Sequence, residues 1–225
     1  MQNHILTTQE LFAPGHTRAW AHLSGYEYPW EILAEIKDII REVGVTLPPD
    51  EYDHPAEDIW IARSARIAPT AYIGAPAIIG ADTEVRHGAF IRGAALVGDG
   101  CVVGNSVELK NCILFDGVQV PHYNYVGDSV LGYKAHMGAG AVTSNVKSDR
   151  TLVSVRAGDE VLETRLKKMG AILGDRVEVG CNSVLNPGTV IGADSNIYPL
   201  SSVRGTVPPR CILKSGKGTE IVEKQ

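Results

Sequence analysis

Two basic side chains in the middle of the sequence have a spacing that suits joint binding of an anion. Arg92 and Lys110 each follow an aliphatic residue and lie 18 residues apart. If 18 residues form one turn of a coil of strands, these side chains stack about 4.8 Å apart. Like charges repel, so the two cations are either an ordinary solvated pair or a clamp for a phosphate dianion. Glu108, two residues before Lys110, is expected on the same side of its strand, where it can orient either cation.

A histidine follows these cations in the segment PHYNYVGD. His122 is either a surface or corner histidine or a general base, because an imidazole with a pKa of about 6.5 can accept a proton from an attacking amine. His87 and His136 are weaker candidates for the same role.

The 35-residue interval between His87 and His122 is similar to that of the hexapeptide-repeat carbonic anhydrases, which hold zinc with three histidines. In that arrangement a third ligand is needed five residues after His122, where this sequence has Gly127. Two histidines are too few for a zinc site. We therefore expect no metal and set aside a zinc-dependent hydratase.

An internal repeat of six residues predicts the scaffold that positions these groups. A small or β-branched residue is usual four positions after each aliphatic one, and Gly often follows the aliphatic residue directly. The aliphatic positions are Ile61, Ile67, Ile73, Ile79, Val85, Ile91, Val97, Val103 and Leu109. Neither a helix nor an ordinary alternating strand has this period.

Three hexads form an 18-residue triangular coil, and successive coils stack by strand pairing. The predicted fold class is an all-β solenoid, a parallel β-helix whose aliphatic residues point inward and whose small residues fit the tapered corners. The step shortens to five residues at Leu114 and again at Leu131, so the register shifts but continues. A second uninterrupted series runs from Leu173 to Val203.

The sequence divides into three parts. Residues 1–56 are expected to form a helical N-terminal cap and linker, with a capping box at Thr7–Glu10 and one long amphipathic helix that Gly44 ends. We expect this segment to cover the open end of the coil. Residues 57–210 form the β-helix, with a charged loop insertion at 146–172, and residues 211–225 form a C-terminal tail. Insertions in solenoids often carry function.

Composition limits the function further. The chain has 225 residues, 44% of them hydrophobic, and a formal net charge of −5, which gives no electrostatic reason to expect nucleic-acid binding. No apolar stretch approaches the roughly 18 residues that span a bilayer, so we expect no membrane association. Four cysteines without a CxxC pair and without a leader segment predict reduced thiols in a cytoplasmic protein. No glycine-rich phosphate loop is present, so we expect no nucleotidyl transfer by this chain.

From about Ile61 to Val203 the chain resembles the acetyltransferase half of the bifunctional N-acetylglucosamine-1-phosphate uridyltransferase/glucosamine-1-phosphate acetyltransferase, and related sugar-phosphate nucleotidyltransferases with hexapeptide-repeat tails. The motif H-x-x-Y-x-G-D at 122–128, followed by Gly138-Ala139-Gly140 and Thr143-Ser144-Asn145, carries the resemblance. The resemblance to hexapeptide-repeat proteins also implies a left-handed coil, against the usual rule for parallel crossovers.

The resemblance implies acetyl-CoA as co-substrate and an amino-sugar 1-phosphate as acceptor, with glucosamine 1-phosphate as the preferred one. His122 is then the catalytic base, Tyr125 and Asn145 contact the amino sugar, and Arg92, Lys110 and Lys168 grip its phosphate. Ala139, Cys181 and Pro199 occupy positions that line the acetyl-CoA groove between subunits of a homotrimer.

The sequence departs from the family pattern at several of these positions. Cys181 and Pro199 replace the usual small residues, His136 replaces an asparagine, and Val146-Lys147-Ser148 follows Asn145 in place of Tyr-Asp-Gly. The alternative is a non-catalytic trimerisation or regulatory module that has kept the coil and lost the activity.

Overall fold

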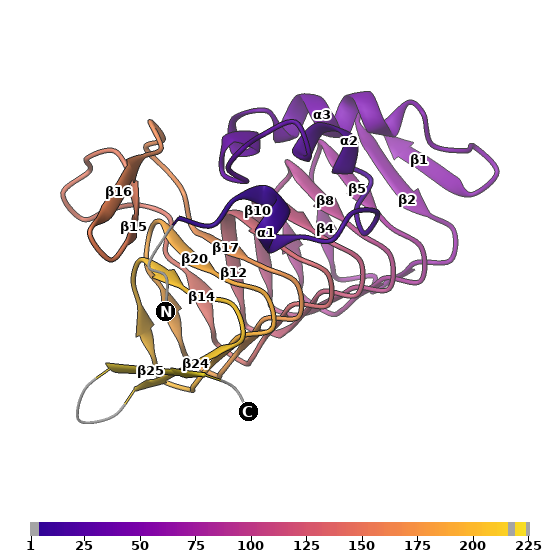
Figure 1. Ribbon diagram of the computed structural model, residues 1–225. Coiled ribbons are helices and arrows are strands. Elements are labelled where there is room, and N and C mark those ends of the chain that lie inside the picture. Colours follow the sequence, from indigo (N-terminus) through magenta and orange to yellow (C-terminus); the bar gives the residue numbers. More distant parts are fainter. Residues whose placement is uncertain (1–4, 216–218, 224–225) are drawn as a thin grey trace.

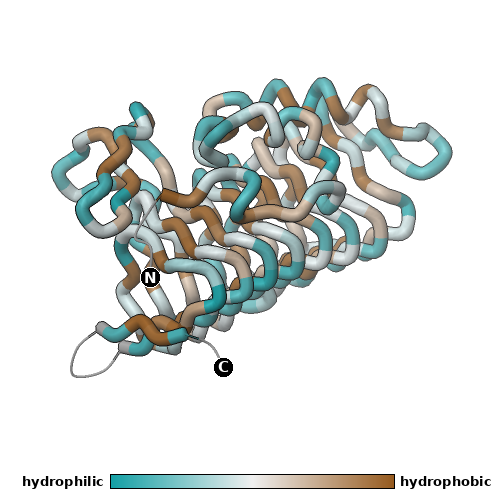
Figure 2. The backbone as a smooth tube through the Cα atoms, in the orientation of Figure 1, coloured by the Kyte–Doolittle hydropathy of each residue, from teal (hydrophilic) through white to brown (hydrophobic). Residues whose placement is uncertain are grey.

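The computed structural model describes residues 5–215 and 219–223 and has the form of a three-sided coil with helical segments along one side (Figure 1). Short strands pair in parallel with the strands one turn before and after, as in Ile78 opposite Leu96. This confirms the predicted all-β solenoid, a left-handed parallel β-helix built from hexads. Figure 2 shows residues of similar hydropathy recurring at matching positions of neighbouring turns.

The coil has three faces, which we call A, B and C. Face A holds β2 (Ile59–Ala62), β5 (Ala77–Ile79), β8 (Ala95–Val97), the second halves of β10 (Glu108–Leu114) and β12 (Tyr125–Leu131), β17 (Ala171–Leu173), β20 (Thr189–Ile191) and β23 (Thr206–Val207). Face B holds β3 (Arg66–Ile67), β6 (Glu84–Val85), β9 (Val102–Asn105), β11 (Gln119–His122), β13 (His136–Met137), β18 (Glu178–Val179), β21 (Asn196–Ile197) and β24 (Cys211–Ser215). Face C holds β4 (Tyr72–Ile73), β7 (Phe90–Ile91), the first halves of β10 and β12, β14 (Val142–Thr143), β19 (Val184–Leu185) and β22 (Ser202–Val203).

The repeated aliphatic residues form the interior, as predicted. Val97, Val103 and Leu109 lie on faces A, B and C, and each is fully buried. Because each face adds one inward residue per turn, the core is a continuous column of Val, Ile, Leu and Met side chains.

The two five-residue steps form unusually tight corners. At each of them a single strand, β10 or β12, continues from face C to face A without a break. The corner residues are Asn111 and Asp128, both with φ of 50°. Asn and Asp tolerate this left-handed conformation better than most residues, because their short side chains can hydrogen-bond locally. The steps at which the repeat shortens therefore place two polar side chains one above the other.

The N-terminal segment lies along face A. It contains α1 (Thr8–Leu11), α2 (Trp20–Leu23), the 3-10 helix η1 (Glu31–Ala34), α3 (Ile36–Gly44) and β1 (Tyr52–Ala56). Face A needs this cover because its strands also carry outward apolar residues, such as Ile78, Leu96 and Ile113, and all three are fully buried. Burying such side chains stabilises each by about 1.5–3 kcal/mol.

Two expectations for the N-terminus were wrong. The long helix is divided, because η1 ends at Ala34 and α3 begins only at Ile36. The helices cover a face rather than the open end of the coil, where β1 instead pairs antiparallel with β2. The signal for this cover was the run of three apolar residues in face A hexads, such as Ala77-Ile78-Ile79.

Residues 144–170 leave the coil between β14 and β17 and contain a hairpin of β15 (Ser154–Ala157) and β16 (Glu160–Glu163). In Figure 1 this hairpin projects on the same side of the coil as the N-terminal helices. Strand pairing continues past residue 210, the expected end of the β-helix, because β24 pairs in parallel with β21. The final strand β25 (Thr219–Glu223) then pairs antiparallel with β24.

No helix in the described ranges 5–215 and 219–223 is long and apolar enough to cross a membrane.

Candidate functional site

The outward side chains of face C bring several of the predicted residues together. In the register of β7 and β10, Phe90 pairs with Glu108 and Ile91 with Leu109, so Arg92 is opposite Lys110. The predicted stacking of these two cations on neighbouring turns is therefore confirmed. Tyr125 pairs with Glu108 on the next turn.

Each cation of the stack has a carboxylate partner. Arg92 Nη1 lies 2.7 Å from Glu108 Oε1, which raises the pKa of the Arg92 guanidinium. Lys110 Nζ donates to both oxygens of Asp128, at 2.8 and 3.0 Å. The four side chains together carry no net charge. Glu108 thus orients Arg92, as the sequence allowed, while Lys110 is held by a carboxylate to which we had assigned no role.

Asp128 is the centre of this polar cluster. Its side chain is only 5% exposed. It accepts hydrogen bonds from Lys110, from Asn111 Nδ2 at 3.0 Å, and from Asn145 Nδ2. Buried carboxylates are stable only when cations or donors surround them in this way. Asp128 therefore fixes the positions of two residues predicted to bind substrate.

Tyr125 and Asn145 form the second part of the cluster. Asn145 Nδ2 donates to the phenol oxygen of Tyr125 at 3.1 Å. Burial, together with the nearby carboxylate of Asp128, raises the pKa of Tyr125. The phenol therefore stays protonated at neutral pH, and its O–H remains a donor for a ligand on face C.

The insertion returns to the coil beside this cluster. Met169 N donates to Asn145 O at 3.1 Å, and Gly170 N donates to Asp128 O at 2.7 Å. Lys168 is the residue just before this junction, and its side chain is exposed. The described residues provide it with no hydrogen bond or ion pair.

His122 ends β11 at the corner between faces B and C and is exposed. The corner is held by the buried side chain of Asn124, which accepts from His122 N at 3.1 Å and donates to Gly138 O and Ala141 O at 2.8 and 3.0 Å. No contact among the described residues joins the imidazole of His122 to Arg92 or Lys110. Within one chain the histidine lies at one edge of face C and the two cations lie at the other.

The three residues expected to line the acetyl-CoA groove continue the corner column of His122. Gln119 pairs with His136, His136 with Glu178, and Glu178 with Asn196. Three residues further along these strands lie His122, Ala139, Cys181 and Pro199, one on each turn. The column is thus contiguous from the candidate base to the last groove position.

The two weaker histidine candidates, His136 and His87, have different surroundings. His136 Nδ1 lies 2.7 Å from Glu178 Oε2 on face B, so it is hydrogen-bonded to a carboxylate there and is not part of the face C cluster. His87 lies two turns before His122, because Asn105 occupies the position between them. No group of three or more metal-binding side chains occurs in the part of the chain that the structure describes.

Sequence reasoning missed Asp128, Asn111 and Asn124. Asp128 and Asn124 belong to the segment His122–Asp128 that was singled out, and Asn111 directly follows Lys110. The useful signal was the position of Asn111 and Asp128 at the two shortened steps, where a polar corner residue is needed.

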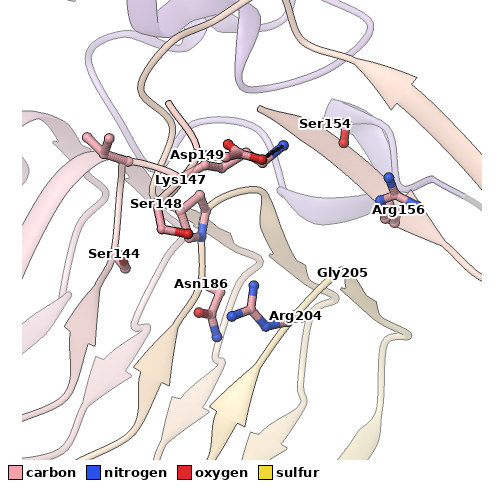
Figure 3. Close-up of a pocket in the computed structure, with 11 residues that line it drawn as sticks. Ser144, Lys147, Ser148, Asp149, Ser154, Arg156, Asn186, Arg204 and Gly205 are labelled. Atoms are coloured by element: carbon pink, nitrogen blue, oxygen red, sulfur yellow. Dashed lines mark ion pairs between the residues drawn. The ribbon is translucent and has the colours of Figure 1, made fainter. Parts of the chain in front are cut away.

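Two cavities flank the cluster. One lies between α3 and the coil and is lined by Arg92, Lys110 and Asn111 together with Leu33 and Lys37. The other lies under the insertion hairpin and is lined by side chains from the loop, the hairpin and the coil (Figure 3).

Comparison with known proteins agrees with this architecture. The fold and the outward polar columns define a hexapeptide-repeat β-helix. Residues 78–197, more than half of the chain, match the GMPPB C-terminal domain family, so the chain belongs to that family.

Two of the curated relatives have much longer chains. The bifunctional sugar-1-phosphate nucleotidylyltransferase/acetyltransferase of Sulfurisphaera tokodaii is 36% identical over 102 residues, which are 45% of this chain and 25% of that protein. The bifunctional protein GlmU of Methanococcus maripaludis is 37% identical over 93 residues, 41% of this chain and 22% of that protein. The chain thus spans about a quarter of the length of these relatives.

A putative acetyltransferase of Escherichia coli, YaiX, is 30% identical over 103 residues, 46% of this chain and 45% of that protein. Among solved structures, the polySia-specific acetyltransferase NeuO superposes with a TM-score of 0.49 and 11% identity, covering 71% of this chain and 80% of that one.

Proposed function

We propose that this chain is an acetyl-CoA-dependent N-acetyltransferase that acts on an amino-sugar 1-phosphate, with glucosamine 1-phosphate as the preferred acceptor. The observation that carries the proposal is the joint arrangement of the face C cluster and the corner column of His122. Membership of the GMPPB C-terminal domain family is consistent with this reaction, and the acetyltransferase activity in the names of relatives supports it.

The proposed mechanism is direct transfer. His122 takes the proton from the substrate ammonium, the free amine attacks the thioester carbonyl, and coenzyme A leaves as the thiol. Tyr125 and Asn145 hold the sugar, while Arg92, Lys110 and Lys168 hold the phosphate. Glu108 keeps Arg92 in place. Fixing the amine beside the acetyl carbon contributes much of the rate.

The separation of His122 from the cations within one chain suits a site built between subunits, so we propose a homotrimer. Face C carries exposed aromatic side chains on its outer surface, Tyr72 and Phe90, whose ring centroids lie 5.5 Å apart. Unpaired apolar groups on an exposed face favour association. The molar mass from light scattering should be three times the 24.1 kDa of one chain. A monomer would contradict the proposal, because the acetyl-CoA groove would lack the wall that a second subunit supplies.

Coenzyme binding has its own test in the exposed thiol of Cys181. Burial raises the pKa of Cys101 and of Cys112 to about 12, and Cys211 is buried, so alkylation should modify Cys181 alone. Acetyl-CoA at ten times its Kd should slow alkylation of Cys181 about tenfold, because only the free protein reacts. ATP at the same concentration is the control ligand, and Cys181→Ser is the control variant. If acetyl-CoA leaves the alkylation rate of Cys181 unchanged, the corner column of His122 does not line the acetyl-CoA groove.

Activity is tested by following free thiol when the protein is mixed with acetyl-CoA and glucosamine 1-phosphate. Thiol should appear with this acceptor and not with glucose 1-phosphate, which lacks the amine.

We also propose that the protein works in the reducing cytoplasm. The four cysteines, none of which forms a disulfide, suit that environment.

One observation favours the alternative, a non-catalytic trimerisation or regulatory module. Arg92 and Lys110 are already neutralised by Glu108 and Asp128, which weakens them as a phosphate clamp. This alternative predicts that no amino-sugar phosphate causes release of the coenzyme A thiol. It also predicts that acetyl-CoA does not protect Cys181 from alkylation.

A further inference from the structure

We propose that the cavity under the insertion hairpin is a second site, one that binds the phosphate group of a small phosphorylated ligand. This inference goes beyond the proposed acetyl transfer and does not depend on it. The cavity has a volume of about 440 Å³ and lies between the loop after β14, strand β15 and the turns of β19 and β22 (Figure 3).

The charge of the cavity is opposite to that of the chain. Lys147, Arg156 and Arg204 line it, with Asp149 as the one carboxylate. These four side chains have a net charge of +2, in a protein whose formal net charge is −5. Such a concentration of positive charge in a concave polar site favours binding of an anion.

Arg156 and Arg204 differ from Arg92 and Lys110 because no residue that the structure describes provides them with a carboxylate partner. Arg92 and Lys110 lie 2.7 and 2.8 Å from acidic oxygens. Arg156 and Arg204 form no ion pair or side-chain hydrogen bond with any residue that the structure describes, and both are exposed to the cavity. Their planar guanidinium groups are suited to two-point binding of phosphate oxygens.

The third cation of the cavity is already engaged. Lys147 Nζ lies 3.7 Å from Asp149 Oδ2 and donates to Thr151 Oγ1 at 2.6 Å. Asp149 in turn accepts from Thr151 N and Thr151 Oγ1, at 2.9 and 2.8 Å. Lys147, Asp149 and Thr151 are thus bonded to one another on the loop side of the cavity. The positive charge that is left to bind a ligand is that of Arg156 and Arg204.

The hairpin wall of the cavity is built into the fold by two glycines of the coil. A Cβ at Gly188 would lie 2.5 Å from Ser154 O, and one at Gly205 would lie 2.8 Å from Arg156 O. Both glycines have φ in the left-handed region, at 81° and 72°. Only glycine permits this close approach without strain. The alternation along β15 then puts Ser154 and Arg156 on the cavity side while Val155 is buried.

The coil wall supplies neutral polar groups beside Arg204. Ser144, Asn186 and Arg204 follow one another on successive turns, because Val142 pairs with Val184 and Val184 with Ser202. Asn186 Nδ2 is fixed by Ser202 Oγ and Val203 O, at 3.1 and 2.8 Å. Its carbonyl oxygen and the Ser144 hydroxyl are suited to hydroxyl groups of a ligand. The chemistry is that of a phosphate joined to a polyhydroxylated group, either a sugar phosphate or the phosphorylated ribose of a nucleotide.

This column also contains Lys110, four strand steps before Arg204, so these two cations lie about 19 Å apart along the coil. The two sites are therefore separable by mutation.

Titration calorimetry with glucose 1-phosphate and with adenosine 3′,5′-bisphosphate tests the proposal. At least one of these probes should bind the unmodified protein, and the tighter one identifies the source of the phosphate. Arg156→Gln and Arg204→Gln should each weaken that binding about ten- to hundredfold, the loss expected for one charge-assisted hydrogen-bond pair. Affinity should also fall as salt is added.

Arg165→Gln is the matched control, because it removes the same charge from the same insertion and does not line the cavity. It should leave the affinity unchanged. Binding of neither probe at millimolar concentration would overturn the proposal, as would full affinity in the Arg156→Gln/Arg204→Gln double variant. If Arg92→Gln abolishes binding while that double variant retains it, the phosphate binds at the face C cluster of Arg92 and Lys110. The proposed acetyl transfer then survives without this second site.

Discussion

Replacing His122 by alanine is expected to lower the rate of acetyl transfer by about two to four orders of magnitude. The reason is the loss of the group that takes the proton from the amine before it attacks the thioester. Protein stability should hardly change, because the imidazole is exposed and the corner is held by the side chain of Asn124 and not by that of His122. Initial rates at saturating substrate, together with thermal denaturation, measure both effects.

His87→Ala is the matched control for this variant. His87 is also exposed and occupies the same corner column two turns earlier, where it contacts Thr70 Oγ1. It should keep the full rate. If His122→Ala retains full turnover, or if both variants lose activity equally, His122 is not the base.

Replacing Asp128 by alanine is expected to have the largest effect on stability of any change in the face C cluster. It removes the acceptor for Lys110, Asn111 and Asn145 at once. Asp128 is 5% exposed and Lys110 is 26% exposed, so the remaining cation can still reach water, and the lost charge-assisted hydrogen bonds are expected to cost about 1.5–3 kcal/mol. Alanine is also less tolerant than aspartate of the φ of 50° at this corner. The free energy of unfolding from denaturant titrations measures the loss.

Two other variants separate the causes. Asp128→Asn removes the charge but keeps the size, one acceptor oxygen and the corner conformation. The difference between it and Asp128→Ala therefore reports strain, lost packing and the remaining hydrogen bonds. Glu108→Ala breaks the other ion pair of the cluster, where the side chains of Arg92 and Glu108 are 48% and 34% exposed. Exposed pairs contribute about 0–1 kcal/mol. If Asp128→Ala costs no more than Glu108→Ala, Asp128 does not hold the cluster together.

The six-residue repeat made the scaffold predictable from sequence, because each strand and corner depends on residues that are adjacent in the sequence. One inward aliphatic residue every six positions determines the strand, the corner and the stacking, and Ile91 and Leu109 are buried as expected. The same arithmetic brought Arg92 next to Lys110, since strand register converts sequence distance directly into spatial distance.

The parts that escaped prediction depend on contacts between segments far apart in sequence. The N-terminal helices pack on face A because Ile78 and Leu96 point outward there, and the hexad period says nothing about outward residues. Likewise, Glu108 was expected beside either cation and pairs with Arg92, but Asp128, which neutralises Lys110, was not expected. The partner of Lys110 lies 18 residues further on, and the shortened step brings it from the expected strand position to the corner.

Transfer of a labelled acetyl group tests the central claim most directly. The protein is incubated with acetyl-CoA carrying ¹³C at its carbonyl carbon and with glucosamine 1-phosphate, and the products are followed by NMR. The account predicts that the labelled carbon becomes an amide bonded to the sugar nitrogen, with one coenzyme A thiol released for each amide formed. Label that remains in the thioester, or that appears only as acetate, would contradict it.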